Sequence, residues 1–170
     1  MPHLWIKEKL FDLSLFEIHS KLDKANLVID ENLRLGKYVE RLVSFELEQQ
    51  DHISVLAENI QIQNGKITLG ELDCILLRNK KPIHLEVIYK FYLYDDSIGD
   101  SEIEHFIGPN RKDSLLEKLT KLNDKQLPLL YSDICMPYLE KLNLKSENIS
   151  YSLVLRKSKL TQYISQSLLI

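Results

Sequence analysis

Charged residues interrupt two consecutive apolar segments in the middle of the chain, within the string GELDCILLRNKKPIHLEVIYKFYL. Side chains alternate along a strand, so His84, Glu86 and Lys90 would share one face of the second segment. A hairpin between the segments would bring Asp73 beside Glu86. Two carboxylates and an ammonium on paired strands form a competent divalent-metal site, because Mg²⁺ chooses carboxylate and carbonyl oxygens.

A plainer interpretation of the same spacing stays open. Glu86 and Lys90 would then be ordinary surface charges on a solvent-facing strand, and Asp73 would lie in a turn. His84 taken by itself is more typical of a packed or hydrogen-bonded histidine than of a metal ligand.

The periodicity of the first half predicts the elements that would position these residues. Apolar residues at three-and-four spacing predict a helix over 32–50, and one or two shorter helices are expected over 4–22. Alternation around Asn64 and Gly65 predicts a β-hairpin. Strands over 72–77 and 83–93 would follow, joined by a turn at 78–82, and such sequential short strands favour a largely antiparallel meander.

The second half is expected to be mainly helical before a final strand over 149–155. Asn110 or Asp113 can cap a helix with an apolar leucine stripe, and a further helix is expected after Pro128. The five acids of 95–104 are typical of a solvated loop. The capped helix also carries a basic face, which is either a solvated surface or a phosphate-binding one: Arg111, Lys112, Lys118, Lys121 and Lys125.

Composition narrows the class of protein. The chain has 170 residues, is 44% hydrophobic, and carries 22 Lys+Arg against 25 Asp+Glu, which favours one soluble domain and excludes a disordered chain. Cys74 and Cys135 have no CxxC partner and are expected to be reduced and buried. No apolar run approaches the roughly 20 residues of a membrane-spanning helix, and no secretory pattern is present, so a cytoplasmic location is expected.

A resemblance adds to this interpretation. Gly70-Glu71-Leu72-Asp73, followed one hairpin later by Glu86 and Lys90, resembles the core of the PD-(D/E)XK phosphodiesterase superfamily. The resemblance implies an α+β (α/β) restriction-endonuclease-like core, with a central mixed sheet and a β-meander flanked by helices. It also implies Mg²⁺ or Mn²⁺ as cofactor and nucleic acid as partner.

More closely, the strings LGKYVE, GELD, HLEV, KFYL and GPN resemble the bacterial domain-of-unknown-function family DUF1853, which has been grouped with these nucleases. The likeness covers about residues 34–130. The chain as a whole, 1–170, is expected to be a single domain of this type, and a short or truncated member. Its apolar end at 167–170 could pair with a second copy in a homodimer.

The resemblance assigns roles residue by residue. Asp73 and Glu86 become the metal carboxylates, and the carbonyl of Val87 is a candidate third ligand. Lys90 becomes the water-positioning base, and Glu40, in the first helix, the auxiliary acid. The candidates for substrate binding are Gln126, Lys118, Lys121 and His84.

The chain departs from the superfamily pattern at the lysine. The usual lysine follows the glutamate by two residues, where this chain has Ile88, so Lys90 would act with its Cα roughly 13 Å from that of Glu86. Two functions therefore stay open. The first is a metal-dependent phosphodiesterase acting on DNA or RNA, and the second is a catalytically inactive binding module of the same fold.

Overall fold

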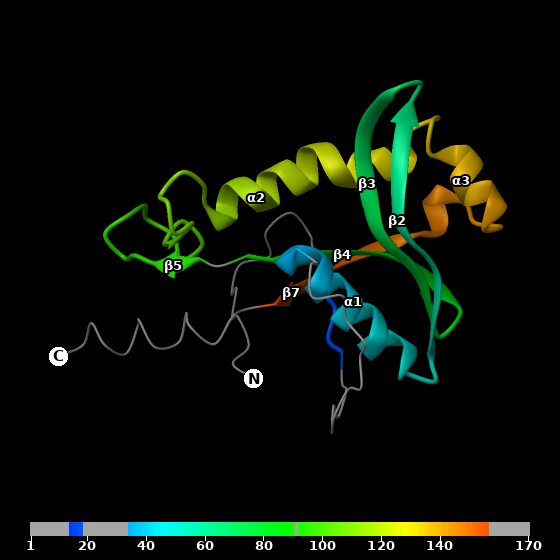
Figure 1. Cartoon of the computed structure of the whole chain (residues 1–170), viewed down its shortest axis with the longest axis horizontal. Helices are drawn as coiled ribbons and strands as arrows, with labels where there is room; N and C mark the ends of the chain where they lie inside the picture. The colour runs from blue at the N-terminus through cyan, green and yellow to red at the C-terminus, as the bar shows by residue number, and fades with distance from the viewer. Residues whose placement is uncertain (1–13, 19–33, 91, 157–170) are drawn as a thin grey trace.

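A mixed five-stranded sheet runs through the part of the chain that the computed structural model describes, residues 14–18, 34–90 and 92–156 (Figure 1). The strand order is β1-β7-β4-β3-β2, and β5 and β6 form a separate small ribbon. The strands are β1 (Ser14–Leu15), β2 (Ile53–Asn64), β3 (Ile67–Arg78), β4 (Lys81–Tyr89), β5 (Leu93–Tyr94), β6 (Phe106–Ile107) and β7 (Ser150–Arg156).

The sheet combines an antiparallel meander with a parallel return. Strands β2, β3 and β4 pair antiparallel in sequence, whereas β7 pairs parallel with β4 on one side and with β1 on the other. A parallel pair needs a long crossover, and the helical segment between β6 and β7 supplies it. This α+β arrangement confirms the expected fold class and is consistent with a restriction-endonuclease-like core.

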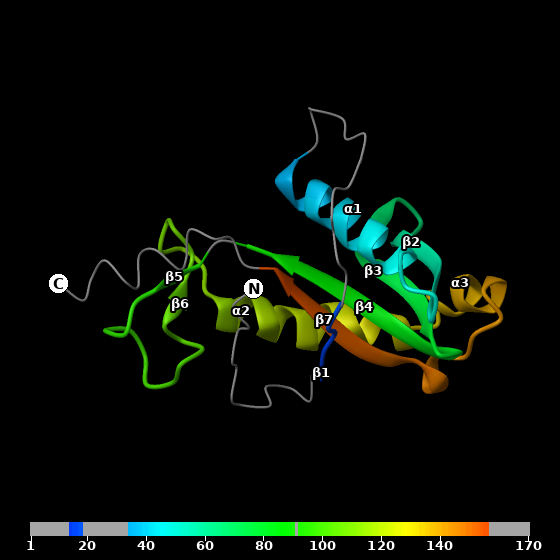
Figure 2. The same cartoon turned by 90° about the horizontal axis from the view of Figure 1, so that it is seen from below.

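Helices cover both faces of the sheet, as Figure 2 shows. Helix α1 (Leu35–Glu48) packs Val39, Val43 and Leu47 against one face. The crossover packs against the other, with buried leucines such as Leu119 and Leu130. Its elements are α2 (Leu115–Lys121), the π-helical turn η1 (Leu122–Gln126), the 3-10 turn η2 (Leu127–Tyr131), α3 (Met136–Lys141) and the 3-10 turn η3 (Ser146–Asn148).

The crossover buries the face of β4 that carries His84 and Glu86. The alternation predicts a polar face that includes His84 and Glu86, but both side chains are buried, at 0% and 2% relative exposure. The reason is that the crossover elements and β7 cover the face that they share with Ile88. The interpretation of Glu86 as a surface charge is therefore wrong.

Several boundaries differ from those expected, for local reasons. The helix cap is Ser114, and neither Asn110 nor Asp113, because the Ser114 hydroxyl accepts the Glu117 N–H while the Glu117 carboxylate accepts the Ser114 N–H. The β3–β4 turn is restricted to Asn79 and Lys80, whose φ angles are 51° and 66°. Strand β3 is also continuous from the hairpin turn onward.

Some of the other local expectations are confirmed and others are not. Helix α1, the hairpin turn at Gly65, the solvated loop around Asp95 and the two free, buried cysteines are confirmed. Of the helices expected over 4–22, Ser14–Leu15 instead form a strand paired with β7, and most of the rest lies outside the described residues. No helix in the described ranges has the length and apolar character needed to cross a membrane.

Candidate functional site

The site begins where β3 and β4 separate. The two strands pair from Arg78↔Lys81 to Cys74↔Leu85, and Asp73 and Glu86 are the next residues along each strand. Beyond that point β3 continues with β2, and β4 continues with β7. Val87 lies beyond the backbone pairing of β3 and β4, and its N–H donates to the side chain of Asp73, at Oδ2, over 2.9 Å. The fork therefore places a carboxylate at the end of the shared ladder.

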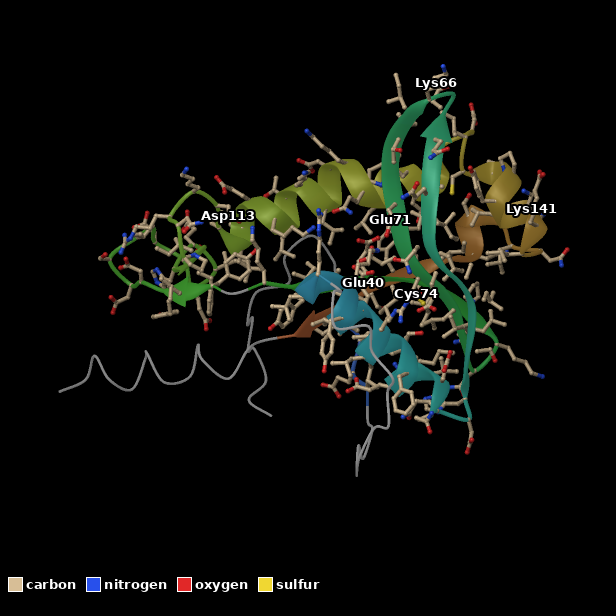
Figure 3. All side chains as sticks on the ribbon, in the orientation of Figure 1. Glu40, Lys66, Glu71, Cys74, Asp113 and Lys141 are labelled. Carbon is tan, nitrogen blue, oxygen red and sulfur yellow. The ribbon has the colours of Figure 1, made fainter. Side chains whose placement is uncertain are left out.

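An open cleft of about 640 Å³ lies beside this fork, between α1 and the β2–β3 hairpin. Asp73 and Val87 line it, together with side chains along most of α1, from Lys37 to Glu48. Figure 3 shows Glu40 and Glu71, which both line the cleft, near each other, whereas Asp113 lies away from them near the start of α2. The charged lining residues are Glu40, Glu48, Glu58, Glu71 and Asp73 against Lys37 and Arg41.

Asp73 has the most strongly raised pKa among the carboxyl groups that line the cleft. Burial and the neighbouring charge of Glu86 raise its pKa from the usual 3.8 to about 7, although the Val87 N–H works in the opposite direction. Glu40 and Glu71 raise it further. Asp73 is thus a partly buried acid surrounded by other acids, as is common where a protein does chemistry.

Lys37 is a cation of the cleft lining that side chains from three elements hold. Its Nζ donates to Glu40 Oε2 at 2.7 Å, to Glu71 Oε1 at 2.9 Å and to Asn59 Oδ1 at 2.5 Å. Burial works against the ammonium, but the hydrogen bonds to the two glutamates outweigh it and raise the pKa of Lys37. One side chain therefore connects α1, β2 and β3.

Glu86 is turned towards the opposite side of the sheet from α1. Its Oε1 accepts a hydrogen bond from His84 Nε2 at 2.8 Å, and both side chains are buried. Within the described part of the chain, His84 Nδ1 has no hydrogen-bond partner. Glu86 is thus close enough for its charge to raise the pKa of Asp73. Its carboxylate, however, is hydrogen-bonded to His84 and does not line the open cleft.

Lys90 lies outside the cleft. Strand β4 ends at Tyr89, and the exposed Lys90 ammonium forms an ion pair with Asp113, in the segment before α2. The strand does not continue far enough to keep Lys90 on the face of Glu86, so the structure does not bring these two side chains together.

The predicted substrate-binding residues of the crossover are also separate from the cleft. Lys118 Nζ donates to Gln126 Oε1 at 3.3 Å, which places these two side chains together where α2 meets η1. Lys121 is exposed on the same helix. None of the three lines the open cleft beside α1.

Two cleft residues, Lys37 and Glu71, were missed by reasoning from the strands. Both stand inside quoted motifs: Lys37 is three residues before Glu40, and Glu71 is two residues before Asp73. The spacing of Lys37 and Glu40 places both on one side of a helix, which was the available signal. Their meeting with Glu71 depends on how the hairpin packs, which no local pattern records.

The donor chemistry of the cleft fits a hard divalent cation. Burial and three neighbouring carboxylates raise the pKa of Asp73, and an added positive charge beside these carboxylates would be favourable. As they lie, however, the described side chains include no group of three His, Cys, Asp or Glu placed to hold a metal ion. A cation would therefore require Glu40, Glu71 or Glu86 to turn from its present partner.

Fold and site together define an α+β protein with a carboxylate-rich cleft at the fork of a mixed sheet. The sequence profile of the family described as a domain of unknown function (DUF1853) matches residues 5–158, so the chain belongs to this family. Neither the curated proteins nor the solved structures include a match to this chain.

Proposed function

We propose that this protein is a metal-dependent phosphodiesterase that cleaves nucleic acid. The observation that carries the proposal is Asp73, a partly buried carboxyl group with its pKa raised to about 7, at the fork beside Glu86. The same pair of residues was singled out by the sequence, where the resemblance to the PD-(D/E)XK superfamily gave them these roles.

Asp73 and Glu86, with the Val87 carbonyl, would hold Mg²⁺ or Mn²⁺. When bound, the metal supplies an activated water and stabilises the charge that develops on the phosphate. Asp73 must be ionised to bind it, so binding is favoured above about pH 7. Glu86 must turn from His84, and Glu40 from Lys37, if either is to face the metal or its water.

In this proposal the substrate contacts both the cleft and helix α2. The cleft itself has more acids than bases, so a phosphate would approach it only together with a cation. Lys118 and Lys121 on α2 would meet phosphates further along the strand of nucleic acid. Cleavage of DNA or RNA, in the cytoplasm, is the activity we propose. Pairing of two copies through 167–170 concerns residues outside those described.

A cleavage assay tests this function. The purified protein is incubated with single-stranded and double-stranded DNA and RNA in Mg²⁺ or Mn²⁺, beside the variant Asp73→Ala. We expect metal-dependent cleavage that the variant loses. The matched control is Asp95→Ala, which removes a half-buried carboxylate of the loop after β5, away from the cleft. The absence of cleavage on all four substrates, with no difference for Asp73→Ala, would overturn the proposal.

The second candidate is a binding module that has lost catalysis. It is favoured by the position of Lys90, which forms an ion pair with Asp113. Lys90 is therefore not placed to position a water molecule beside Glu86. In that case Glu86→Gln should leave nucleic-acid binding intact, while Lys118→Glu with Lys121→Glu should weaken it and reduce its salt dependence. Loss of binding by the Glu86 variant at unchanged stability would contradict this alternative.

A further inference from the structure

Three oxygen atoms from three elements converge on the ammonium of Lys37. They belong to Glu40 of α1, Asn59 of β2 and Glu71 of β3, at 2.7, 2.5 and 2.9 Å. An ammonium group has three N–H donors, so all of them are used by these acceptors. While it is bound in this way, Lys37 has no donor left for a water molecule or a phosphate.

The two glutamates that Lys37 holds are the same ones that act on Asp73. Both Glu40 and Glu71 raise the pKa of Asp73 through their charge. Lys37 therefore neutralises part of the negative charge that a divalent cation at Asp73 would also neutralise. Two cations that draw on the same carboxylates within one cleft compete with each other.

We propose that Lys37 is a resident counter-ion of the cleft, which holds Glu40 and Glu71 together and is displaced from at least one of them when a divalent cation binds. The divalent cation in this statement rests on the proposed function. Lys37 is accordingly a positioning residue that sets how tightly the cleft binds metal.

The exposure of Lys37 is consistent with such a release. Its side chain is 46% exposed, and it begins in the first turn of α1, so its long methylene chain can move the ammonium into solvent. Glu40 and Glu71 are less exposed, at 24% and 28%, and would stay in the cleft. Of these three side chains, Lys37 is the longest and the most exposed, so it is the one that can leave the cleft.

Metal binding measured on four proteins tests this inference. Mn²⁺ affinity is measured by calorimetry at pH 8 for the wild type, Lys37→Met, Lys37→Arg and Arg41→Met. Arg41 also lines the cleft, so its variant removes the same charge without removing the contacts to Glu40 and Glu71. We expect Lys37→Met to bind Mn²⁺ roughly tenfold more tightly than wild type, which corresponds to about one pKa unit of electrostatic interaction. Arg41→Met and Lys37→Arg should change the affinity by less than about threefold.

Unfolding temperatures provide the second measurement. Without metal, Lys37→Met should unfold at a lower temperature than the wild type, because Glu40 and Glu71 are left without their counter-ion. Added Mn²⁺ should raise the unfolding temperature of Lys37→Met more than that of the wild type, in keeping with its tighter binding. An equal or smaller rise would overturn the inference, as would unchanged or weaker affinity in the calorimetry.

The cleavage assay, run on the same samples, separates this inference from the proposed function. If the wild type cleaves nucleic acid but Lys37→Met binds Mn²⁺ no more tightly, the counter-ion role is wrong and the function stands. If Lys37→Met binds more tightly but neither protein cleaves any substrate, the counter-ion role stands and the function fails. If neither protein binds Mn²⁺, both are overturned.

Discussion

The loop that carries Asp95 and Glu104 and the cleft that carries Asp73 are both rich in carboxylates, but their surroundings shift the pKa in opposite directions. Asp95 accepts hydrogen bonds from the Ser97 hydroxyl and N–H and from Arg111, which lower its pKa. The Ser101 hydroxyl and N–H and the Asp100 N–H lower that of Glu104. In the cleft, burial and neighbouring carboxylates raise the pKa of Asp73 to about 7.

The difference lies in where the donors come from. In the loop, Asp95 and Glu104 each accept hydrogen bonds from backbone N–H groups and hydroxyls of their own turns, so their charges stabilise the local conformation. The acids that act on Asp73 come from α1, β3 and β4, and within the described part of the chain its carboxylate accepts one hydrogen bond, from the Val87 N–H. Acids that the fold gathers from separate elements, with a raised pKa among them, are typical of sites that bind cations or do chemistry.

The largest expected effect is on cleavage. Asp73→Asn removes the ionisable group at the fork and should reduce the rate of metal-dependent cleavage by roughly 10²–10³-fold. Asp95→Asn makes the same chemical change in the loop and should leave the rate within about twofold. Initial rates on one labelled substrate measure both. Equal losses in the two variants would show that the comparison between loop and cleft has no bearing on activity.

The next effect is on stability and concerns the buried pair of His84 and Glu86. Glu86→Leu leaves both ring nitrogens of His84 buried without a partner and should lower the free energy of unfolding by about 2–3 kcal/mol. His84→Phe combined with Glu86→Leu removes both polar groups and should recover part of this loss. Glu104→Leu, in the exposed loop, should have a smaller effect. Urea denaturation compares all of them.

An unchanged urea midpoint in Glu86→Leu would contradict this account of the buried pair. It would mean that the hydrogen bond at 2.8 Å contributes little and that Glu86 is free to turn towards Asp73 at no cost. The double variant is the control for packing, since it changes the volume of the same region without leaving a histidine unpaired.

Stability should also depend on pH, with opposite signs in the two regions. The folded protein holds a proton on Asp73 up to about pH 7, whereas the unfolded chain releases it near 3.8. Unfolding between these values releases a proton, so the metal-free protein should lose stability as the pH rises, by at most about 1.4 kcal/mol per pH unit. Asp73→Asn should flatten this dependence.

The loop acids should act in the opposite direction. The lowered pKa values of Asp95 and Glu104 mean that their contribution is present above the ordinary carboxyl pKa and is lost as the pH falls through the lowered value. Urea midpoints between pH 3 and pH 8 measure both regions in one series. A decline with rising pH that persists in Asp73→Asn would show that another group causes it.

The sequence was sufficient for the parts of the site that depend on local pattern. The alternation of β3 and β4 with a short turn between them was enough to place Asp73 beside Glu86, and the helical spacing was enough to place Glu40 on α1. The sequence could not show which face of β4 the crossover covers, because that depends on the parallel return of β7. For this reason the burial of Glu86 was not predicted, whereas His84 is packed and hydrogen-bonded, as is typical of a lone histidine among apolar residues.

Gly70 illustrates the same limit within a motif. It belongs to the GELD string, but a β-carbon at this position would collide with the side chain of Leu129 in η2. The glycine thus leaves room beside β3 for a terminal methyl of Leu129, which is a matter of tertiary packing. The place of Lys37 was not predicted for a related reason, since its partners come from three separate elements.

The smallest expected effect comes from Lys90→Met. Lys90 is 42% exposed and Asp113 is 35% exposed, so the loss of their ion pair should lower the free energy of unfolding by less than about 1 kcal/mol. Because Lys90 lies outside the cleft, Mn²⁺ affinity and cleavage should stay within about twofold of wild type, whereas Lys37→Met changes the affinity. Calorimetry and initial rates measure both variants. Loss of cleavage in Lys90→Met at unchanged stability would mean that the segment after β4 moves to the fork during the reaction. Lys90 would then have the role that the resemblance assigned to it.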